Sequence, residues 1–171
     1  MNKHWLNLKY TLHHKWLVFI ECVQMGIPLR GIIHDWTKFL PREWNAYATH
    51  FFSGDASSKT DKMAWKIAGP EFELAWNHHQ KKNDHHWQFW VRLGDDGTVL
   101  VLPMSHAARR EMLADWRGAG RARGLPNTWE WYVKVKDNIQ LHPDTRKWLV
   151  RELEWQYQRY QTGYPLEWLD R

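Results

Sequence analysis

The sequence holds one cysteine, Cys22, among its 171 residues. A single cysteine excludes an internal disulfide and any zinc site built from several thiolates. Cys22 lies in an apolar run, so we expect its thiol to be buried and unreactive. Long apolar runs are also missing, because no segment reaches the roughly 18 residues that a membrane-spanning helix needs. The apolar stretch of residues 16–20 is too short for a secretory signal, so we expect a cytoplasmic protein.

Tryptophan and histidine are unusually common, with 14 and 11 residues. Hydrophobic residues make up 43% and charged residues 25% of the chain, which at this length predicts one globular domain over residues 1–171. We expect most of the tryptophans to fill a helical core. The histidines gather in short clusters, which favours metal binding. The formal net charge of +5 favours anionic partners such as nucleotides, and nucleic acid is not excluded.

Most of the chain shows the periodicity of helices. Apolar spacing, glycine stops and first-turn prolines predict helices over residues 4–25, 28–38, 41–52, 71–82, 105–121, 127–138 and 143–161. Residues 53–60 are expected to form a loop, and a helical pattern resumes from Asp61 until Gly69. Residues 87–102 differ, since two apolar runs flank Gly94-Asp-Asp-Gly97, which is a hairpin signal. We therefore predict an all-α domain with a core over 4–122, C-terminal helices 127–161 packed on it, and one small β-hairpin near 87–102.

The dipeptide His34-Asp35 follows an almost apolar helix and is expected to be buried. A buried, ionised aspartate is costly unless a cation balances its charge, and a metal ion would do so. His14 and Asp115 lie on two other predicted helices and complete a candidate set of ligands. Nitrogen and oxygen donors of this kind suit Mn, Fe, Zn or Mg. His13 is adjacent to His14, and the residues alone leave the choice between them open.

A second histidine cluster occupies residues 78–86. If the helix that begins near residue 71 continues, His79, Asn83 and His86 share one of its faces. His78, Lys82 and His85 then share the neighbouring face. One set can bind a second ion while the other contacts substrate or acts as a general acid; we favour His79 and His86 as the metal-facing pair. Asp84, Glu43 and Glu111 are candidates to accept hydrogen bonds from the imidazoles.

The order of these residues resembles that of the HD superfamily of metal-dependent phosphohydrolases. The matching pieces are His14 with Val18 four residues later, His34-Asp35-x-Thr37-Lys38, and the distant Asp115. A closer likeness, over roughly residues 8–122, is to an uncharacterised family of bacterial and phage proteins. Thr37 departs from the usual glycine or serine. The stretch after His79 also lacks the Gly-Tyr-Pro of cyclic-dinucleotide phosphodiesterases, so that specificity is not expected.

The resemblance implies an HD-like helical bundle and assigns roles to residues. It favours His14 over His13 as a ligand and implies that bound metal supplies hydroxide near neutral pH. Lys38, one turn after His34, is expected to neutralise a phosphate. The predicted metal ligands are His14, His34, Asp35, His79, His86 and Asp115. The predicted catalytic residues are Asp35, Lys38 and His85, and the predicted substrate-binding residues are Lys38, His78, Lys82, Trp87 and Arg117.

Three functions are compatible with these features. The leading hypothesis is hydrolysis of a nucleotide or related phosphate ester with one or two divalent ions, in a bacterial cell or a phage-infected host. The second is an HD-like di-iron oxygenase, because histidine-rich two-metal sites serve both chemistries. The third is a non-catalytic phage or bacterial binding protein with a basic surface. The sequence leaves the substrate undetermined and a homodimer open.

Overall fold

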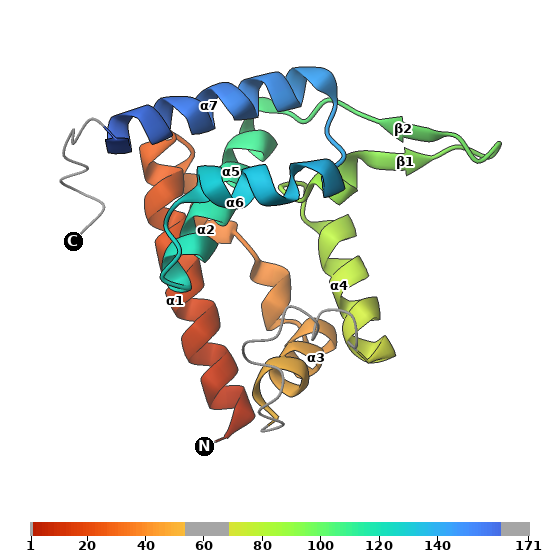
Figure 1. The fold of residues 1–171 in the computed structure, drawn as a ribbon. Coiled ribbons are helices and arrows are strands. Elements are labelled where there is room, and N and C mark those ends of the chain that lie inside the picture. Colours follow the sequence, from red (N-terminus) through yellow and green to blue (C-terminus); the bar gives the residue numbers. More distant parts are fainter. Residues whose placement is uncertain (1, 54–68, 162–171) are drawn as a thin grey trace.

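The structure is a computed structural model that describes residues 2–53 and 69–161 of the chain. Within these residues the chain forms seven α-helices and one two-stranded antiparallel hairpin (Figure 1). The prediction of a helical fold with a small hairpin is therefore confirmed. Residues 54–60 of the loop predicted over 53–60, and the helical segment expected from Asp61, lie outside the described residues. No helix within the described ranges is long and apolar enough to cross a membrane.

Helix α1 (Lys3–Gln24) begins after Asn2, whose side chain accepts a hydrogen bond from the backbone N–H of His4. The helix ends where Gly26 takes a φ of +72°. The next residue, Ile27, donates its backbone N–H back to the carbonyl of Cys22, which completes a left-handed glycine cap. Pro28 then opens the short helix α2 (Pro28–Ile33). The cap turns the chain sharply, so that α2 packs against the end of α1.

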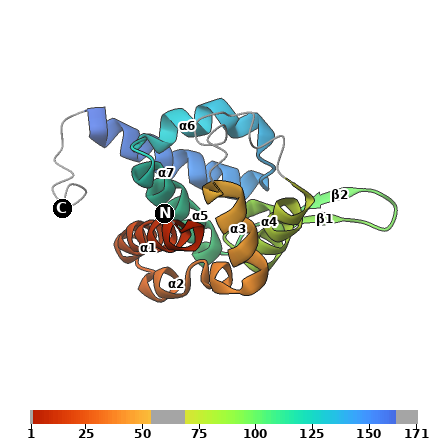
Figure 2. The same cartoon turned by 90° about the horizontal axis from the view of Figure 1, so that it is seen from below.

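Helix α5 (His106–Ala122) packs along α1 (Figures 1 and 2). The two backbones approach closely at Gly118, where an added Cβ would lie 2.7 Å from Cγ2 of Val18. His14 lies one helical turn before Val18, and Asp115 lies nearly one turn before Gly118. The close crossing therefore holds the side chains of His14 and Asp115 at the same level between the two helices.

Two further helices form the opposite wall of this region. Helix α3 (Pro41–Phe52) packs against α1 and against helix α4 (Pro70–Lys82). The contact between α3 and α4 buries Tyr47, Phe72 and Ala75. Before α3, the chain makes a 3-10 turn, η1 (Trp36–Phe39). Helices α1, α3, α4 and α5 thus surround the segment that contains His34 and Asp35.

The C-terminal helices cover the other side of α5. Helix α6 (Thr128–Val135) continues into the 3-10 turn η5 (Lys136–Asn138), and helix α7 (Pro143–Gln161) crosses above them (Figure 1). The largest buried cluster lies among α5, α6 and α7 and contains Met104, Ala108, Met112, Leu113, Tyr132, Ile139, Leu141, Trp148, Leu149 and Leu153. This apolar core fixes α5, and through it the position of Asp115.

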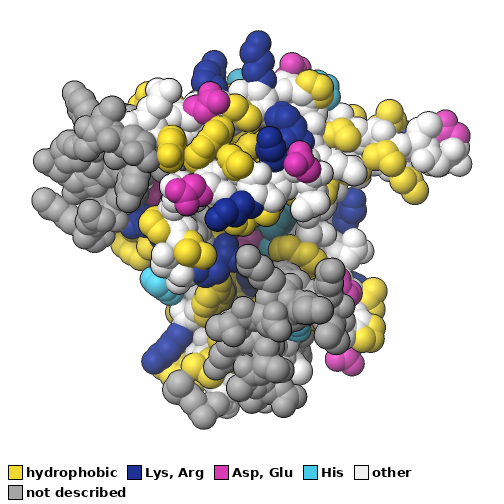
Figure 3. Space-filling view, viewed as in Figure 1, with side chains coloured by type: hydrophobic (Ala, Val, Ile, Leu, Met, Phe, Trp, Pro, Cys, Tyr) yellow, Lys and Arg dark blue, Asp and Glu magenta, His cyan; other side chains and the backbone are white. Residues whose placement is uncertain are grey.

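The hairpin projects from the helical body. Strands β1 (Val91–Leu93) and β2 (Val99–Val101) pair in antiparallel register, with Val91 opposite Val101. Hydrophobic side chains are visible along the projecting arm in Figure 3. The strands are shorter than the predicted 87–102 span, because residues Trp87–Trp90 form a 3-10 turn, η4.

The tryptophans fill the core only in part. Among the described residues only Trp148 is buried. Five others are exposed by 38–59%: Trp5, Trp16, Trp36, Trp131 and Trp155. Trp87, Trp90, Trp116 and Trp129 are half-buried and pack against the main core cluster, so the expectation that tryptophans fill the core is met only in part. The fully buried residues of that cluster are mainly aliphatic and methionine side chains.

Candidate metal centre

The segment that carries His34 and Asp35 is not part of a continuous helix, contrary to the prediction of a helix over 28–38. Helix α2 ends at Ile33, and Asp35 adopts a left-handed conformation with φ +54°. Lys15 on α1 donates through Nζ to the backbone carbonyls of Ile32 and His34, at 2.7 and 2.5 Å. A straight helix would aim neighbouring side chains about 100° apart. The break lets His34 and Asp35 point to the same place.

A first set of donor atoms converges from three elements. Nε2 of His14 lies 3.2 Å from Oδ1 of Asp115 and 3.6 Å from Oδ2 of Asp35. Nε2 of His34 lies 3.4 Å from both Nε2 of His14 and Oδ2 of Asp35, and 3.6 Å from Oδ1 of Asp115. His14 and His34 each lie close to both aspartates, although Asp35 and Asp115 do not share one group of donor atoms within 4.8 Å. The structure supports His14 rather than the exposed His13.

A second set of donors faces the other oxygen of the same carboxylate. Oδ1 of Asp35 lies 3.2 Å from Nε2 of His79 and 3.3 Å from Nε2 of His85. One nitrogen of His86 joins this set, since one ligand atom from each of the four residues lies within 4.8 Å of the others. Asp35 thus stands between two groups of imidazoles, with one oxygen toward each.

The donor spacing fits divalent ions. An ion about 2.1 Å from each ligand places neighbouring ligands about 3.0 Å apart in an octahedron and about 3.4 Å apart in a tetrahedron. The measured separations of 3.2–3.6 Å in the first set lie close to these values. Several atoms of the residues in the second donor set are also buried without a hydrogen-bond partner in the described structure: Asp35 Oδ1, His85 Nε2 and His86 Nε2. A bound cation would satisfy these atoms.

Two buried glutamates orient the histidines. Glu111 on α5 accepts from Nδ1 of His34 at 2.9 Å and from Nδ1 of His85 at 3.1 Å. Glu43 on α3 accepts from Nδ1 of His79 and of His78, each at 2.8 Å. Because a carboxylate can only accept, these contacts place the ring protons on Nδ1 and leave the Nε2 lone pairs free for a metal.

Polar side chains hold the two glutamates in turn. Thr37 donates to Glu43 at 3.0 Å, and Asn83 donates to Thr37 at 3.0 Å. The threonine that departs from the HD pattern therefore supports an orienting carboxylate. Arg30 on α2 donates hydrogen bonds to both Glu111 and Asp84. Asp84 was expected to accept from an imidazole, but in the structure its carboxylate bonds to Arg30, which in turn holds Glu111.

The charge balance also favours a cation. Burial by itself would raise the pKa of Asp35, but the charges of His34, Lys38 and His79 outweigh it and hold that pKa well below its ordinary value. Burial would likewise raise the pKa of Asp115, and hydrogen bonds from His14 and His34 hold it well below. Both carboxylates are therefore ionised at neutral pH. Where the histidines are neutral, these two carboxylates leave buried negative charge, which a bound metal ion would balance.

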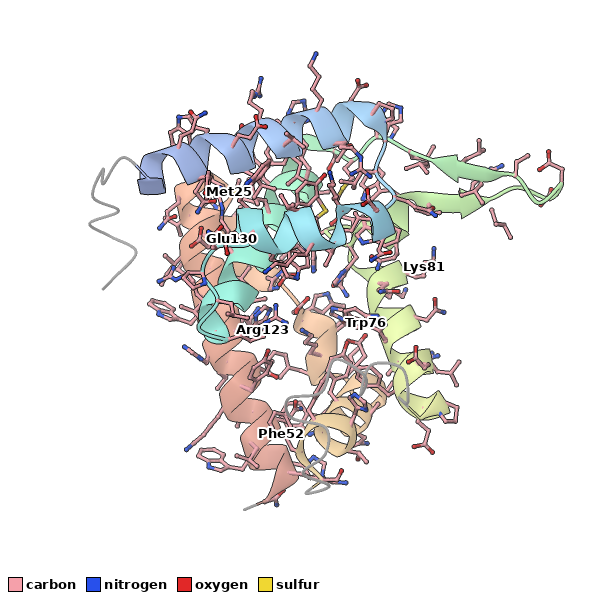
Figure 4. All side chains as sticks on the ribbon, in the orientation of Figure 1. Met25, Phe52, Trp76, Lys81, Arg123 and Glu130 are labelled. Carbon is pink, nitrogen blue, oxygen red and sulfur yellow. The ribbon has the colours of Figure 1, made fainter. Side chains whose placement is uncertain are left out.

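Burial, and then the charges of His85 and His79, lower the pKa of His86 well below its ordinary value. His86 therefore stays neutral, which is the form of imidazole that binds metal. Trp76, labelled in Figure 4, extends from α4 toward the interior and stacks on His79 with ring centroids 5.6 Å apart. This aromatic contact closes the second donor set on the side of α4.

A family model matches residues 3–154 of the chain. The chain belongs to DUF5662, a family of unknown function. No curated protein and no solved structure matches it. The matched range contains all seven residues of the two donor sets.

The second histidine cluster differs from the predicted arrangement. Helix α4 ends at Lys82, and Asn83 takes an extended conformation, so the expected helical faces do not exist beyond that residue. His85 and His86 reach the site from the turn that follows, and both join the donors with His79. The position of His85 among these donor atoms was not predicted, because it depends on where the helix stops.

The predicted substrate-binding residues are divided in space. Lys38 lies in the centre, with Nζ 2.6 Å from Oδ2 of Asp35. His78 also contacts the site, because its Nδ1 bonds to Glu43, which orients His79. Lys82 is exposed at the end of α4. Trp87 packs against the C-terminal core.

Arg117 is not brought to the donors either. It lies two residues after Asp115 and so points about 200° away from it around α5. There Arg117 donates to Gln156 at 2.8 Å and lies 4.0 Å from Glu21. Lys15 and Arg30, which support the site, carried no recognisable signal in the sequence, because their roles come from contacts between helices.

Proposed function

We propose that this protein is a metal-dependent phosphohydrolase of the HD type, which uses two divalent ions and a metal-activated water on a nucleotide or related phosphate ester. One observation carries the proposal: the buried carboxylate of Asp35 presents one oxygen to each of two sets of ligands. Paired ions held by a shared carboxylate are the arrangement used by many phosphoesterases, where they stabilise both the attacking and the leaving oxygen.

We assign the ligands to two ions, although His34, His85 and Asp115 form a further group that crosses the two sets. His14, His34, Asp35 and Asp115 would hold one ion, and Asp35, His79, His85 and His86 would hold the other. The chemistry supplied by bound ions is the acidification of water and the polarisation of a phosphoryl oxygen. Glu111 and Glu43 keep the imidazole nitrogens in the protonation state that this requires. We assign His85 to the ligands in place of the general acid.

Lys38 supplies a cation next to the shared carboxylate. Its Nζ lies 2.6 Å from Asp35, and its side chain is 17% exposed. Burial by itself would lower the pKa of Lys38, but the charges of Asp35 and Asp115 and the hydrogen bond to Asp35 together outweigh it and raise that pKa. The ammonium group therefore persists at neutral pH. We assign Lys38 to bind a phosphoryl oxygen of the substrate as a point charge.

An aromatic ring beside the first donor set supports a nucleotide as the substrate. Tyr10 is 42% exposed and stacks on His14 with ring centroids 6.4 Å apart. Its exposed face offers a nucleobase a surface for stacking next to the metal ligands. Tyr10 takes this role in place of Trp87, which packs on the core. The positive net charge of the chain is compatible with a phosphate ester.

The number of imidazoles favours one alternative chemistry. Five histidines and two aspartates also suit a pair of iron ions, as in an HD-like di-iron oxygenase. The two functions differ in what is consumed. Hydrolysis consumes water and releases phosphate with Mn²⁺ or Mg²⁺, whereas an oxygenase consumes dioxygen and requires iron.

The test compares the metal content and activity of the wild type with those of Asp35→Asn. Asparagine tolerates the left-handed backbone of residue 35, so the variant should fold while losing the charge between the two sets. We expect two equivalents of metal in the wild type, at most one in the variant, and phosphate release from a panel of nucleotides by the wild type alone. Asp137→Asn, a change in the η5 turn, is the matched control.

The possible outcomes separate the candidate functions. Bound iron with dioxygen consumption and no phosphate release would favour the oxygenase. Absence of metal after reconstitution with Mn²⁺, Fe²⁺ and Zn²⁺ would reject both enzymes and leave a binding protein.

A further inference from the structure

Helix α1 carries a second apolar stripe besides the face that packs against α5. The stripe consists of Trp5, Lys9, Leu12, Trp16, Phe19 and Val23, which recur at alternating intervals of four and three residues. This is the heptad spacing of a helix that packs against another long helix. The stripe lies about 140° around α1 from Val18, so it faces away from the interior.

Most of this stripe is exposed in the described structure. Helix α2 covers it only at Phe19, where a Cβ added to Gly31 would lie 3.0 Å from Cα of Phe19. The exposed fractions of the other apolar members are Trp5 49%, Leu12 51%, Trp16 59% and Val23 49%.

The exposed apolar area of the stripe is a substantial part of a protein interface. At roughly 200 Å² for each large apolar side chain, the four exposed members leave on the order of 400 Å² of apolar surface. A stable interface of standard size buries about 800 Å² on each partner, so these residues would supply about half of it.

We propose that the stripe is the interface of a homodimer, in which α1 of one copy packs antiparallel against α1 of a second copy. The spacing of the stripe is the same when read from either end. A two-fold axis at the level of residue 14 therefore pairs Trp5 with Val23, Lys9 with Phe19, and Leu12 with Trp16 of the other copy. Such a self-complementary patch is what a two-fold interface requires.

Lys9 selects the antiparallel orientation. In a parallel pair, the two copies of Lys9 would face each other in the seam, where like charges repel. In the antiparallel pair, each Lys9 lies against the ring of Phe19 from the other copy, which is a favourable cation–π contact. Within one copy, Lys9 already lies over the ring of Trp5, with Nζ 5.2 Å from its centroid.

The first experiment measures the mass of the full-length protein in solution by sedimentation. We expect a dimer for the wild type and a monomer for Trp16→Glu, with unchanged circular dichroism and metal content. Leu100→Glu is the control, because it places the same charge at a residue of the hairpin that is 44% exposed; it should stay dimeric. A monomeric wild type, or a dimer that Trp16→Glu leaves intact, would overturn the proposal.

The second experiment measures the orientation of the helices. A spin label on Lys3→Cys would lie about 33 Å along the helix axis from its copy in the antiparallel dimer, but only about 10 Å away in a parallel one. Cys22 is buried, and burial raises the pKa of its thiol to about 12, so the label goes to residue 3. The short distance would refute the antiparallel pairing.

Discussion

Replacing Glu111 by glutamine should lower the affinity for both proposed metal ions, whereas the same change at Glu43 should lower the affinity for only one. Glu111 orients His34 of the first donor set and His85 of the second, at 2.9 and 3.1 Å. Glu43 orients His79 of the second set and the neighbouring His78. The two glutamates therefore differ in how many of the two donor sets they contact.

The expected size of each effect follows from the loss of one charged acceptor behind a ligand. Removing such a partner typically lowers metal affinity by about 10- to 100-fold, which is about 1.4 to 2.7 kcal/mol. Glutamine keeps the size of the side chain but is a neutral and weaker acceptor. At residue 111 its NH2 group would also face Arg30, which donates to Oε2 of Glu111. Glu111→Gln should thus lower the affinity at both steps of a titration, and Glu43→Gln at one step.

Isothermal titration of the metal-free protein with Mn²⁺ or Zn²⁺ measures both steps. Glu130→Gln, which removes an exposed charge on α6, is the control and should titrate like the wild type. Equal losses for Glu43→Gln and Glu111→Gln at both steps would refute the division of ligands into two sets. An unchanged titration for Glu111→Gln would show that its contacts do not orient the ligands.

Further predictions concern pH and packing. Contacts with carboxylates outweigh burial and raise the pKa of His34 and His85 above the ordinary 6.5 in the metal-free protein; protons compete with metal below a raised pKa, so metal affinity should already fall as pH drops through neutrality. Metal titrations at several pH values measure this effect. A metal affinity that stays unchanged down to pH 6 would contradict the prediction. Gly118→Ala should destabilise the fold by about 1–3 kcal/mol in thermal unfolding, because the new Cβ would lie 2.9 Å from the backbone nitrogen of Val18. An unchanged or raised melting temperature would show that α1 and α5 can separate without cost.

The first donor set was accessible from the sequence because each residue carried a local signal. His34-Asp35 followed an apolar run, and His14 and Asp115 lay on strongly periodic helices. The resemblance to the HD pattern gave their order, and in the structure His14 and His34 each lie close to both aspartates. The orienting roles of Glu43 and Glu111 were anticipated only as candidates, because which ring each carboxylate contacts depends on how α3 and α5 are packed.

The second donor set was predicted only in part. The sequence placed His79 and His86 toward the metal by extending α4 to residue 86, whereas α4 ends at Lys82 and His85 also turns inward. Arg117 was expected to bind substrate because of its proximity to Asp115 in the chain, but it faces Gln156 on the far side of α5. The end of α4 changed which histidines face the donors, and the rotation of residue 117 around α5 carried Arg117 away from Asp115. Spacing along the chain predicts neither of these directions.

The sequence by itself determined the helices, their caps and the types of metal-binding side chain, because these follow from local periodicity and from residues such as Gly26 and Pro28. The tertiary structure alone decided that Asp35 faces two sets of histidines. That arrangement needs a left-handed residue, a lysine from α1 that holds the preceding carbonyls, and the close crossing at Gly118. Each of these depends on residues far apart in the chain, so their effect exists only once the helices have packed.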